Sequence, residues 1–98
     1  MKNIVLFCAA GMSTSLLVKK MQTAAESENY ECNIAAYSYA DLMSKGPDAD
    51  IILLGPQVRF NEKKTKDAFP EKPVMVIPMT MYGRMDGKGV MGEVQKLI

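Results

Sequence analysis

The sequence predicts an α/β fold in which a parallel sheet is covered by helices on both faces. Short apolar runs recur along the 98 residues, and each is followed by a segment with helical character. The first run, residues 4–7, is apolar at every position, which is typical of a strand buried on both faces. Strands that alternate with helices are joined by right-handed crossovers, so we expect them all to run parallel.

Glycine and proline mark most boundaries between the expected elements. The expected strands are residues 4–7, 32–37, 50–54 and 74–77. The expected helices are residues 12 or 13 to 27, 39–45, 59–69 and 89–98. In the first helix, Leu17, Met21 and Ala24 recur with helical spacing and should face the sheet. The second strand is the least apolar, which indicates a place near an edge of the sheet.

The last helix is expected to close the domain. Val90, Val94 and Leu97 should share its buried face. Asp86, within the sequence MDG, is expected to be a turn residue or, preferably, the cap at the start of this helix. The alternative is that its carboxyl group reaches the site from the fourth loop, where a phosphatase would need an acid to protonate its leaving group.

Composition limits the possible functions. A chain of 98 residues is expected to form one domain, residues 1–98. Twelve basic and eleven acidic residues leave a formal charge of +1, which argues against nucleic acid as a partner because phosphate-backbone binding needs a clustered basic excess. No apolar run approaches the roughly 20 residues of a membrane span, and the N-terminal run is too short for a signal peptide, so we expect a cytoplasmic protein.

The chain has two cysteines, Cys8 and Cys32, and no histidine. This composition excludes Cys–His catalysis and histidine-containing metal sites, and two cysteines cannot form a thiolate metal site alone, so no metal or cofactor is expected. Cys8 ends the first strand and Cys32 begins the next parallel one. They should therefore be too far apart for a disulfide and remain free thiols.

The loop after the first strand carries the candidate catalytic residue, Cys8. Unpaired N–H groups at a helix start and the positive end of the helix dipole stabilise a thiolate, and the same groups bind phosphate. The expected phosphate-binding residues are the small, hydroxylated or adjoining residues Ala9, Ala10, Gly11, Met12, Ser13, Thr14 and Ser15. We expect Cys8 to attack phosphorus and to hold the phosphoryl group in this loop.

Other interpretations of the loop remain open. Cys8 is a buried structural cysteine in one of them, with Ser13, Thr14 or Ser15 serving only as a helix cap. In another, the chain is a small Cys-dependent phosphatase or an anion-binding module. Small tyrosine phosphatases have the pattern C-x5-R-[ST], and here Thr14 stands where that pattern has the arginine that grips phosphate.

Ligands of parallel sheets bind beyond the carboxyl ends of the strands, where three loops of this chain should converge. Cys8 lies in the first of these loops, and Gln57 and Tyr82 lie in the others and are expected on the rim of the site. Several methionines are expected either to add an adaptable apolar rim or to fill the core: Met12, Met79, Met81 and Met85.

Three stretches of the chain resemble the IIB components of the bacterial sugar phosphotransferase system (PTS), of the lactose/cellobiose (N,N'-diacetylchitobiose) class. They are LFCAAGMSTSLLVKKM at residues 6–21, DIILLGPQV at 50–58 and YGRMDGKGV at 82–90. The resemblance implies a single EIIB-type domain with a four-stranded parallel sheet in the order 2-1-3-4, a three-layer arrangement of the flavodoxin or Rossmann kind. It also implies that Cys8 takes a phosphoryl group from a phosphohistidine of a IIA partner. The group then passes to a sugar, of the β-linked disaccharide class, that enters through a membrane IIC partner.

Overall fold

The computed structural model describes residues 1–9 and 14–98 of the chain. These residues include four strands that form one parallel sheet in the order β2-β1-β3-β4, which confirms the expected order. The strands are β1 (Lys2–Cys8), β2 (Cys32–Ser38), β3 (Ile51–Leu54) and β4 (Val74–Val76). The α-helices are α1 (Thr14–Ser27), α2 (Leu42–Lys45), α3 (Glu62–Ala68), α4 (Met79–Gly83) and α5 (Gly87–Leu97). The 3₁₀ helices η1 (Tyr39–Asp41) and η2 (Pro56–Asn61) lead into α2 and α3.

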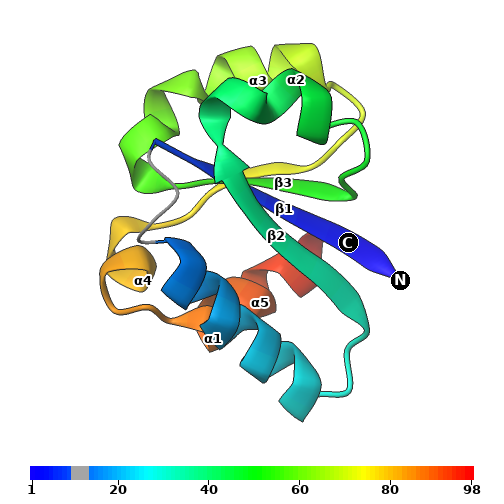
Figure 1. Cartoon of the computed structure of the whole chain (residues 1–98), viewed down its shortest axis with the longest axis vertical. Helices are drawn as coiled ribbons and strands as arrows, with labels where there is room; N and C mark the ends of the chain where they lie inside the picture. The colour runs from blue at the N-terminus through cyan, green and yellow to red at the C-terminus, as the bar shows by residue number, and fades with distance from the viewer. Residues whose placement is uncertain (10–13) are drawn as a thin grey trace.

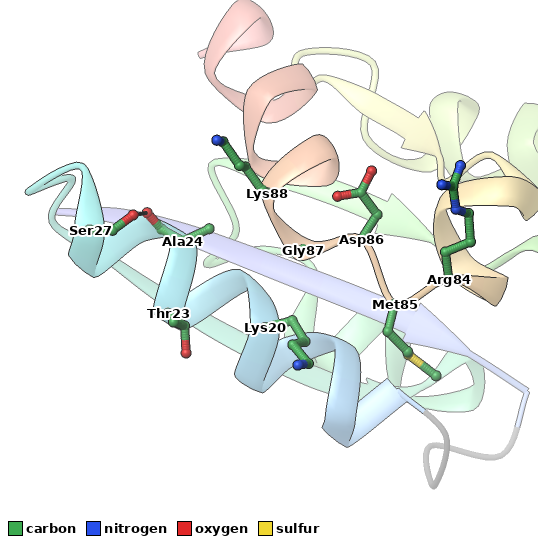
Figure 2. Close-up of a pocket in the computed structure, with 9 residues that line it drawn as sticks. All are labelled: Lys20, Thr23, Ala24, Ser27, Arg84, Met85, Asp86, Gly87 and Lys88. Atoms are coloured by element: carbon green, nitrogen blue, oxygen red, sulfur yellow. Dashed lines mark hydrogen bonds between the residues drawn. The ribbon is translucent and has the colours of Figure 1, made fainter.

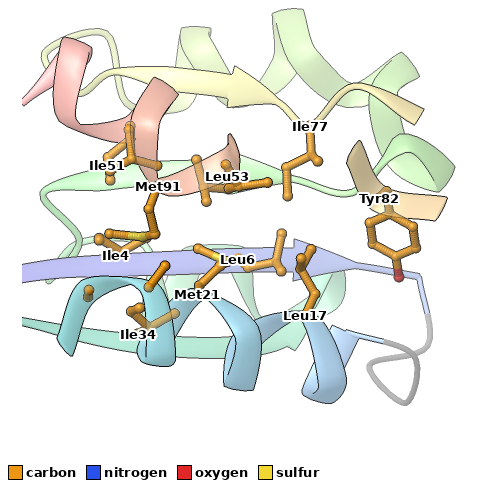
Figure 3. Close-up of a cluster of buried hydrophobic side chains, with 14 residues drawn as sticks. Ile4, Leu6, Leu17, Met21, Ile34, Ile51, Leu53, Ile77, Tyr82 and Met91 are labelled. Carbon is orange, nitrogen blue, oxygen red and sulfur yellow. The ribbon is translucent and has the colours of Figure 1, made fainter. Parts of the chain in front are cut away.

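The sheet separates two layers of helices, with α1 and α5 on one face and α2 and α3 on the other (Figure 1). Successive side chains of β1 point to opposite faces, so alternate residues enter two different cores. Ile4 and Leu6 share the larger core with Leu17 of α1 (Figure 3). Val5 and Phe7 belong to the smaller core on the α2 and α3 face. Burial on both faces explains why this strand is apolar at every position.

The register of the sheet places the two cysteines at its opposite ends. Cys8 pairs with Ser38 at the end of β2, whereas Cys32 pairs with Lys2 near the start of β1. Both cysteines are free thiols. The edge at which Cys8 lies is the one where the strands of a parallel sheet end and ligands bind.

The structure differs from the sequence expectation mainly in the second half of the chain. The sequence pattern does not predict α4, because a helix of five residues is too short to show a helical period. The helices expected at residues 39–45 and 59–69 both begin with a 3₁₀ segment. Leu97, expected on the buried face of α5, is 49% exposed, and Met91 is fully buried instead. In the last turn it is Ile98, not Leu97, that packs against the core.

The turn between α4 and α5 has a well-defined backbone. Met85 has a positive φ of 52°, and the N–H of Asp86 donates to the carbonyl of Met81 at 2.9 Å, which closes α4. Asp86 then caps α5, because its Oδ1 accepts the N–H of Gly89 at 2.9 Å. The cap predicted at Asp86 is confirmed, and α5 begins at Gly87, two residues earlier than the sequence pattern indicates.

Candidate functional site

Three loops begin at the same level of the sheet, beyond the carboxyl ends of β1, β3 and β4. The N–H of Gly55, just after β3, donates to the carbonyl of Phe7 in β1 at 2.9 Å. The N–H of Ile77, just after β4, donates to the carbonyl of Leu54 in β3 at 2.9 Å. These bonds extend the pairing of the strands to the first residues of the loops after β3 and β4, so these loops start from hydrogen-bonded backbone.

The Cys8 side chain is almost completely buried, with only 2% of its surface exposed. Its Sγ lies 3.3 Å from Oγ1 of Thr14, and either atom can be the donor. The thiol can also donate to the carbonyl of Tyr37, at a distance of 3.9 Å. A thiolate has no proton to donate, so it would lose the bond to Tyr37 and keep the one that the Thr14 hydroxyl donates. Thr14 is therefore the described side chain placed to stabilise an anionic sulfur.

Thr14 lies at the start of a helix and is buried. It is the first residue of α1, and its side chain is fully buried. A threonine hydroxyl in such a place needs a hydrogen-bond partner, and Cys8 is one of them. Burial of Cys8 alone would also fit a structural cysteine. Chemistry on phosphate also needs groups that bind the phosphate. Cys8 lies near such groups, because it stands at the carboxyl edge of the sheet beside a hydroxyl at the start of a helix.

The other residues expected to bind phosphate are placed only in part. Ala9 is exposed directly after β1, and Ser15 is exposed in the first turn of α1. The remaining four lie outside the described residues: Ala10, Gly11, Met12 and Ser13.

The residues expected on the rim differ in their exposure. Gln57 is exposed in η2, beyond the end of β3. Tyr82 is only 7% exposed and belongs to the larger core, so it does not form a solvent-facing rim, although it lies at the same end of the sheet as the tip of β1 (Figure 3). Met79 is 62% exposed, whereas Met81 and Met85 are half-buried against the core. Of these methionines, only Met79 therefore has the exposure that a docking rim needs.

Sequence reasoning missed the contact between Cys8 and the backbone of Tyr37. A backbone carbonyl leaves no signal in the residue type. Only the pairing of β1 with β2, in which Cys8 lies opposite Ser38, brings this carbonyl to the sulfur.

A separate hollow of about 570 Å³ lies between α1 and the turn that joins α4 to α5 (Figure 2). Figure 2 shows Arg84 and Lys88 on either side of Asp86, with Lys20 across from them on α1. Cys8 is not among the residues that line it. This hollow is therefore distinct from the immediate surroundings of the thiol.

The described part of the chain contains no cluster of three or more His, Cys, Asp or Glu side chains able to hold a metal ion. Among the same residues, no helix combines the length and the apolar character needed to cross a bilayer.

Cys32 offers a second thiol with different chemistry. Desolvation by partial burial raises the pKa of the Cys32 thiol. We expect iodoacetamide to alkylate Cys32, in a Cys8→Ser background, with a rate midpoint above the pH of about 8.5 that a free cysteine shows. The folded chain holds the Cys32 proton more tightly than the unfolded chain does, so the proton stabilises the fold at pH values below the pKa of the unfolded thiol. This stabilisation is lost as the pH rises through the pKa of the folded thiol. A midpoint at or below that of a peptide thiol would contradict the effect of burial.

Comparison with known proteins identifies the family. The family model described as "PTS system, Lactose/Cellobiose specific IIB subunit" matches residues 3–93. The chain belongs to this family. It is thus an EIIB component of the PTS, a protein-phosphohistidine–sugar phosphotransferase, and this membership implies IIA and IIC partners.

The relatives of this EIIB chain differ in the sugar that they are named for. The galactose-specific EIIB component of Lactococcus lactis subsp. cremoris (strain MG1363) is 45% identical over 104 residues, covering 99% of this chain and 96% of the relative. The cellobiose-specific EIIB component of Lactococcus lactis subsp. lactis (strain IL1403) shows the same identity and coverage. The oligo-beta-mannoside-specific EIIB component of Bacillus subtilis (strain 168) is 39% identical over 90 residues, covering 90% of this chain and 87% of the relative. Family membership therefore does not fix the sugar.

Solved structures agree with the fold. The solution structure of the cellobiose-specific IIB component from Borrelia burgdorferi has a TM-score of 0.76 at 38% identity, covering 93% of this chain and 85% of that one. The lactose-specific IIB component domain from Streptococcus pneumoniae has a TM-score of 0.86 at 15% identity, covering 98% and 96%, and this likeness bears on the fold alone.

Proposed function

We propose that Cys8 of this EIIB chain accepts a phosphoryl group from a phosphohistidine of IIA and donates it to a sugar delivered by the membrane protein IIC. The observation that carries the proposal is the contact of 3.3 Å between Cys8 Sγ and Thr14 Oγ1 at the carboxyl edge of the sheet, where α1 begins. The chain would act in the cytoplasm and reach the membrane through IIC.

Each half-reaction exchanges one bond to phosphorus for another. In the first, the thiol gives up its proton, Sγ attacks phosphorus and an S–P bond forms. The P–N bond to the IIA imidazole breaks, and the imidazole nitrogen keeps the electron pair and takes up a proton. In the second, a sugar hydroxyl attacks phosphorus, the S–P bond breaks and Sγ regains its electron pair. The sugar hydroxyl loses its proton, and the sulfur takes up one proton to become a thiol again.

The residues around Cys8 suit a group that must be passed on. Thr14 supplies a neutral hydroxyl, and residues 9–15 carry no charged side chain. A fixed arginine would bind the transferred phosphate bidentately and more strongly. Neutral donors hold the group in place and still allow its release, which supports a relay over a hydrolase. The absence of the phosphatase arginine, with Thr14 at its position, likewise disfavours the phosphatase interpretation.

The proposal predicts a specific covalent adduct. Mixing the chain with IIA that has been phosphorylated through the general PTS proteins should add one phosphoryl group to Cys8. Intact-mass measurement and peptide mapping would locate it, and sensitivity to acid and iodine would distinguish phosphocysteine from a phosphate ester. An unmodified chain, or an adduct on another residue, would contradict the proposal.

We further propose a β-linked disaccharide as the sugar. Two of the relatives named above are specific for cellobiose or for oligo-beta-mannoside, which are both β-linked. Phosphorylation assays with membranes containing the cognate IIC, comparing cellobiose with galactose, would test this choice. A preference for galactose would overturn the choice of sugar and leave the role of Cys8 unaffected.

A further inference from the structure

Gln57 and Cys8 come from different loops, and both lie next to Gly55. Gln57 stands in η2, two residues after Gly55, and its side chain is exposed. A Cβ built on Gly55 would lie 2.8 Å from Oε1 of Gln57 and 3.4 Å from Cβ of Cys8. The amide oxygen of Gln57 and Cβ of Cys8 thus both border the position that a side chain at residue 55 would occupy, and residue 55 is a glycine.

The Gln57 amide also has unused hydrogen-bonding capacity. In the part of the chain that the structure describes, its side chain makes no hydrogen bond. Its terminal NH₂ carries two donors, and its torsions are free to turn them toward the sulfur side. A phosphoryl group on Cys8 Sγ would carry three oxygens, and each of them accepts hydrogen bonds.

We infer that Gln57 is a donor to the phosphoryl group on Cys8, acting from the loop after β3, whereas Thr14 acts from the start of α1. This inference rests on the proposed function and deepens it by assigning a second neutral donor to the same site. Thr14 begins α1, which follows β1, and Gln57 follows β3, so the two donors come from the ends of neighbouring strands. A neutral amide stabilises the charge that develops on the oxygens without adding a cation that would retain the group.

Two substitutions remove this donor by different means. Gln57→Ala deletes the amide. Gly55→Ala leaves the amide present but places a methyl group 2.8 Å from the present position of Oε1, so the flexible Gln57 side chain must move away. The φ of −63° at Gly55 is open to alanine, and the distance of 3.4 Å to Cys8 Cβ is at the boundary of ordinary contact. Gly55→Ala should therefore displace Gln57 while leaving the nucleophile in place.

The expected results are a loss of phosphoryl-transfer rate and a shift of the transfer equilibrium. Gln57→Ala should accept the group from phosphorylated IIA about tenfold more slowly, since one hydrogen bond to a charged group is lost. It should also shift the equilibrium between phosphorylated IIA and phosphorylated EIIB toward IIA. Gln57→Glu should be slower still, because its carboxylate repels the phosphoryl oxygens. Gly55→Ala should show most of the Gln57→Ala defect, and the double variant should be no slower than the slower single variant.

The matched control is Gln22→Ala, which removes the same amide from the exposed face of α1 and should transfer normally. The equilibrium constant separates a donor from a structural residue, because a purely structural role would lower the melting temperature without shifting the balance between the two phosphoproteins. Wild-type rate and equilibrium in Gln57→Ala would overturn the inference, and so would additive defects in the double variant. If the wild-type chain carries phosphate on Cys8 in the same experiment, these outcomes contradict only the role of Gln57 and not the proposed function of Cys8.

Discussion

Cys8→Ser should abolish phosphoryl acceptance from IIA and leave the fold in place. A serine hydroxyl is slightly smaller than a thiol, and two polar groups among the described residues can still bond it: the hydroxyl of Thr14 and the carbonyl of Tyr37. The free energy of unfolding should thus change by about 1 kcal/mol or less. The chemistry should fail, because a serine hydroxyl does not ionise near neutral pH and the chain has no histidine to activate it. The measurement is the phosphoprotein mass after incubation with phosphorylated IIA, together with the melting temperature.

Cys32→Ser is the matched control, because it makes the same chemical change at the opposite end of the sheet. It should accept the phosphoryl group at the wild-type rate. Transfer by the Cys8 variant at a rate comparable to wild type would rule out a phosphocysteine relay at this position. Loss of transfer in the Cys32 variant would mean that both thiols take part.

Gly87→Ala should destabilise the protein strongly. A Cβ at this position would lie 2.5 Å from the backbone nitrogen of Met21 and 2.6 Å from the carbonyl oxygen of Lys20. Both atoms belong to the backbone of α1, so no side chain can turn aside, and α1 and α5 must move apart over the larger core. We expect a loss of about 3 kcal/mol, at the upper end of overpacking effects. For a domain of this size the melting temperature should fall by roughly 10 to 20 °C.

Gly92→Ala provides an internal comparison in the same helix. Gly92 is exposed in α5, and a Cβ there would meet nothing within 4 Å. Alanine should stabilise the helix by about 0.5 to 1 kcal/mol, because glycine has the greater backbone freedom to lose. Thermal unfolding of the two variants should therefore shift in opposite directions. An equal response would mean that the close contact between Gly87 and α1 relaxes at little cost.

Much of the fold can be predicted from the sequence because the strongest local signals agree with the tertiary contacts. The unbroken apolar run in β1 and the spacing of Leu17, Met21 and Ala24 in α1 each report burial that the structure confirms. The cap of α5 at Asp86 can be predicted because it depends on local geometry alone, although the helical pattern places the first residue of α5 two positions too late. Leu97 was assigned to the buried face by spacing alone, and spacing does not show which residue of the last turn reaches the core.

The surroundings of Cys8 are harder to read from sequence. The hydroxyl of Thr14 is visible in the sequence, but its contact with sulfur depends on how α1 packs after the loop. The contact with Tyr37 depends on the register between β1 and β2, and it involves a backbone group that any residue would provide. Gln57 and Cys8 both lie next to Gly55, which has no side chain between them. From the sequence alone, this glycine indicates only a turn.

Under the proposed relay, the position of Cys8 also determines how IIA and IIC share the carrier. The residue is held between β2 and β3 at the end of a paired strand, and its thiol is nearly enclosed. A sulfur fixed in this way carries one phosphoryl group at a time and cannot swing between two docking positions. IIA and the sugar bound to IIC must therefore visit the same sheet edge in turn, so that occupancy by one delays the other. An excess of unphosphorylated IIA should then slow delivery to the sugar, because it competes for this edge of the sheet.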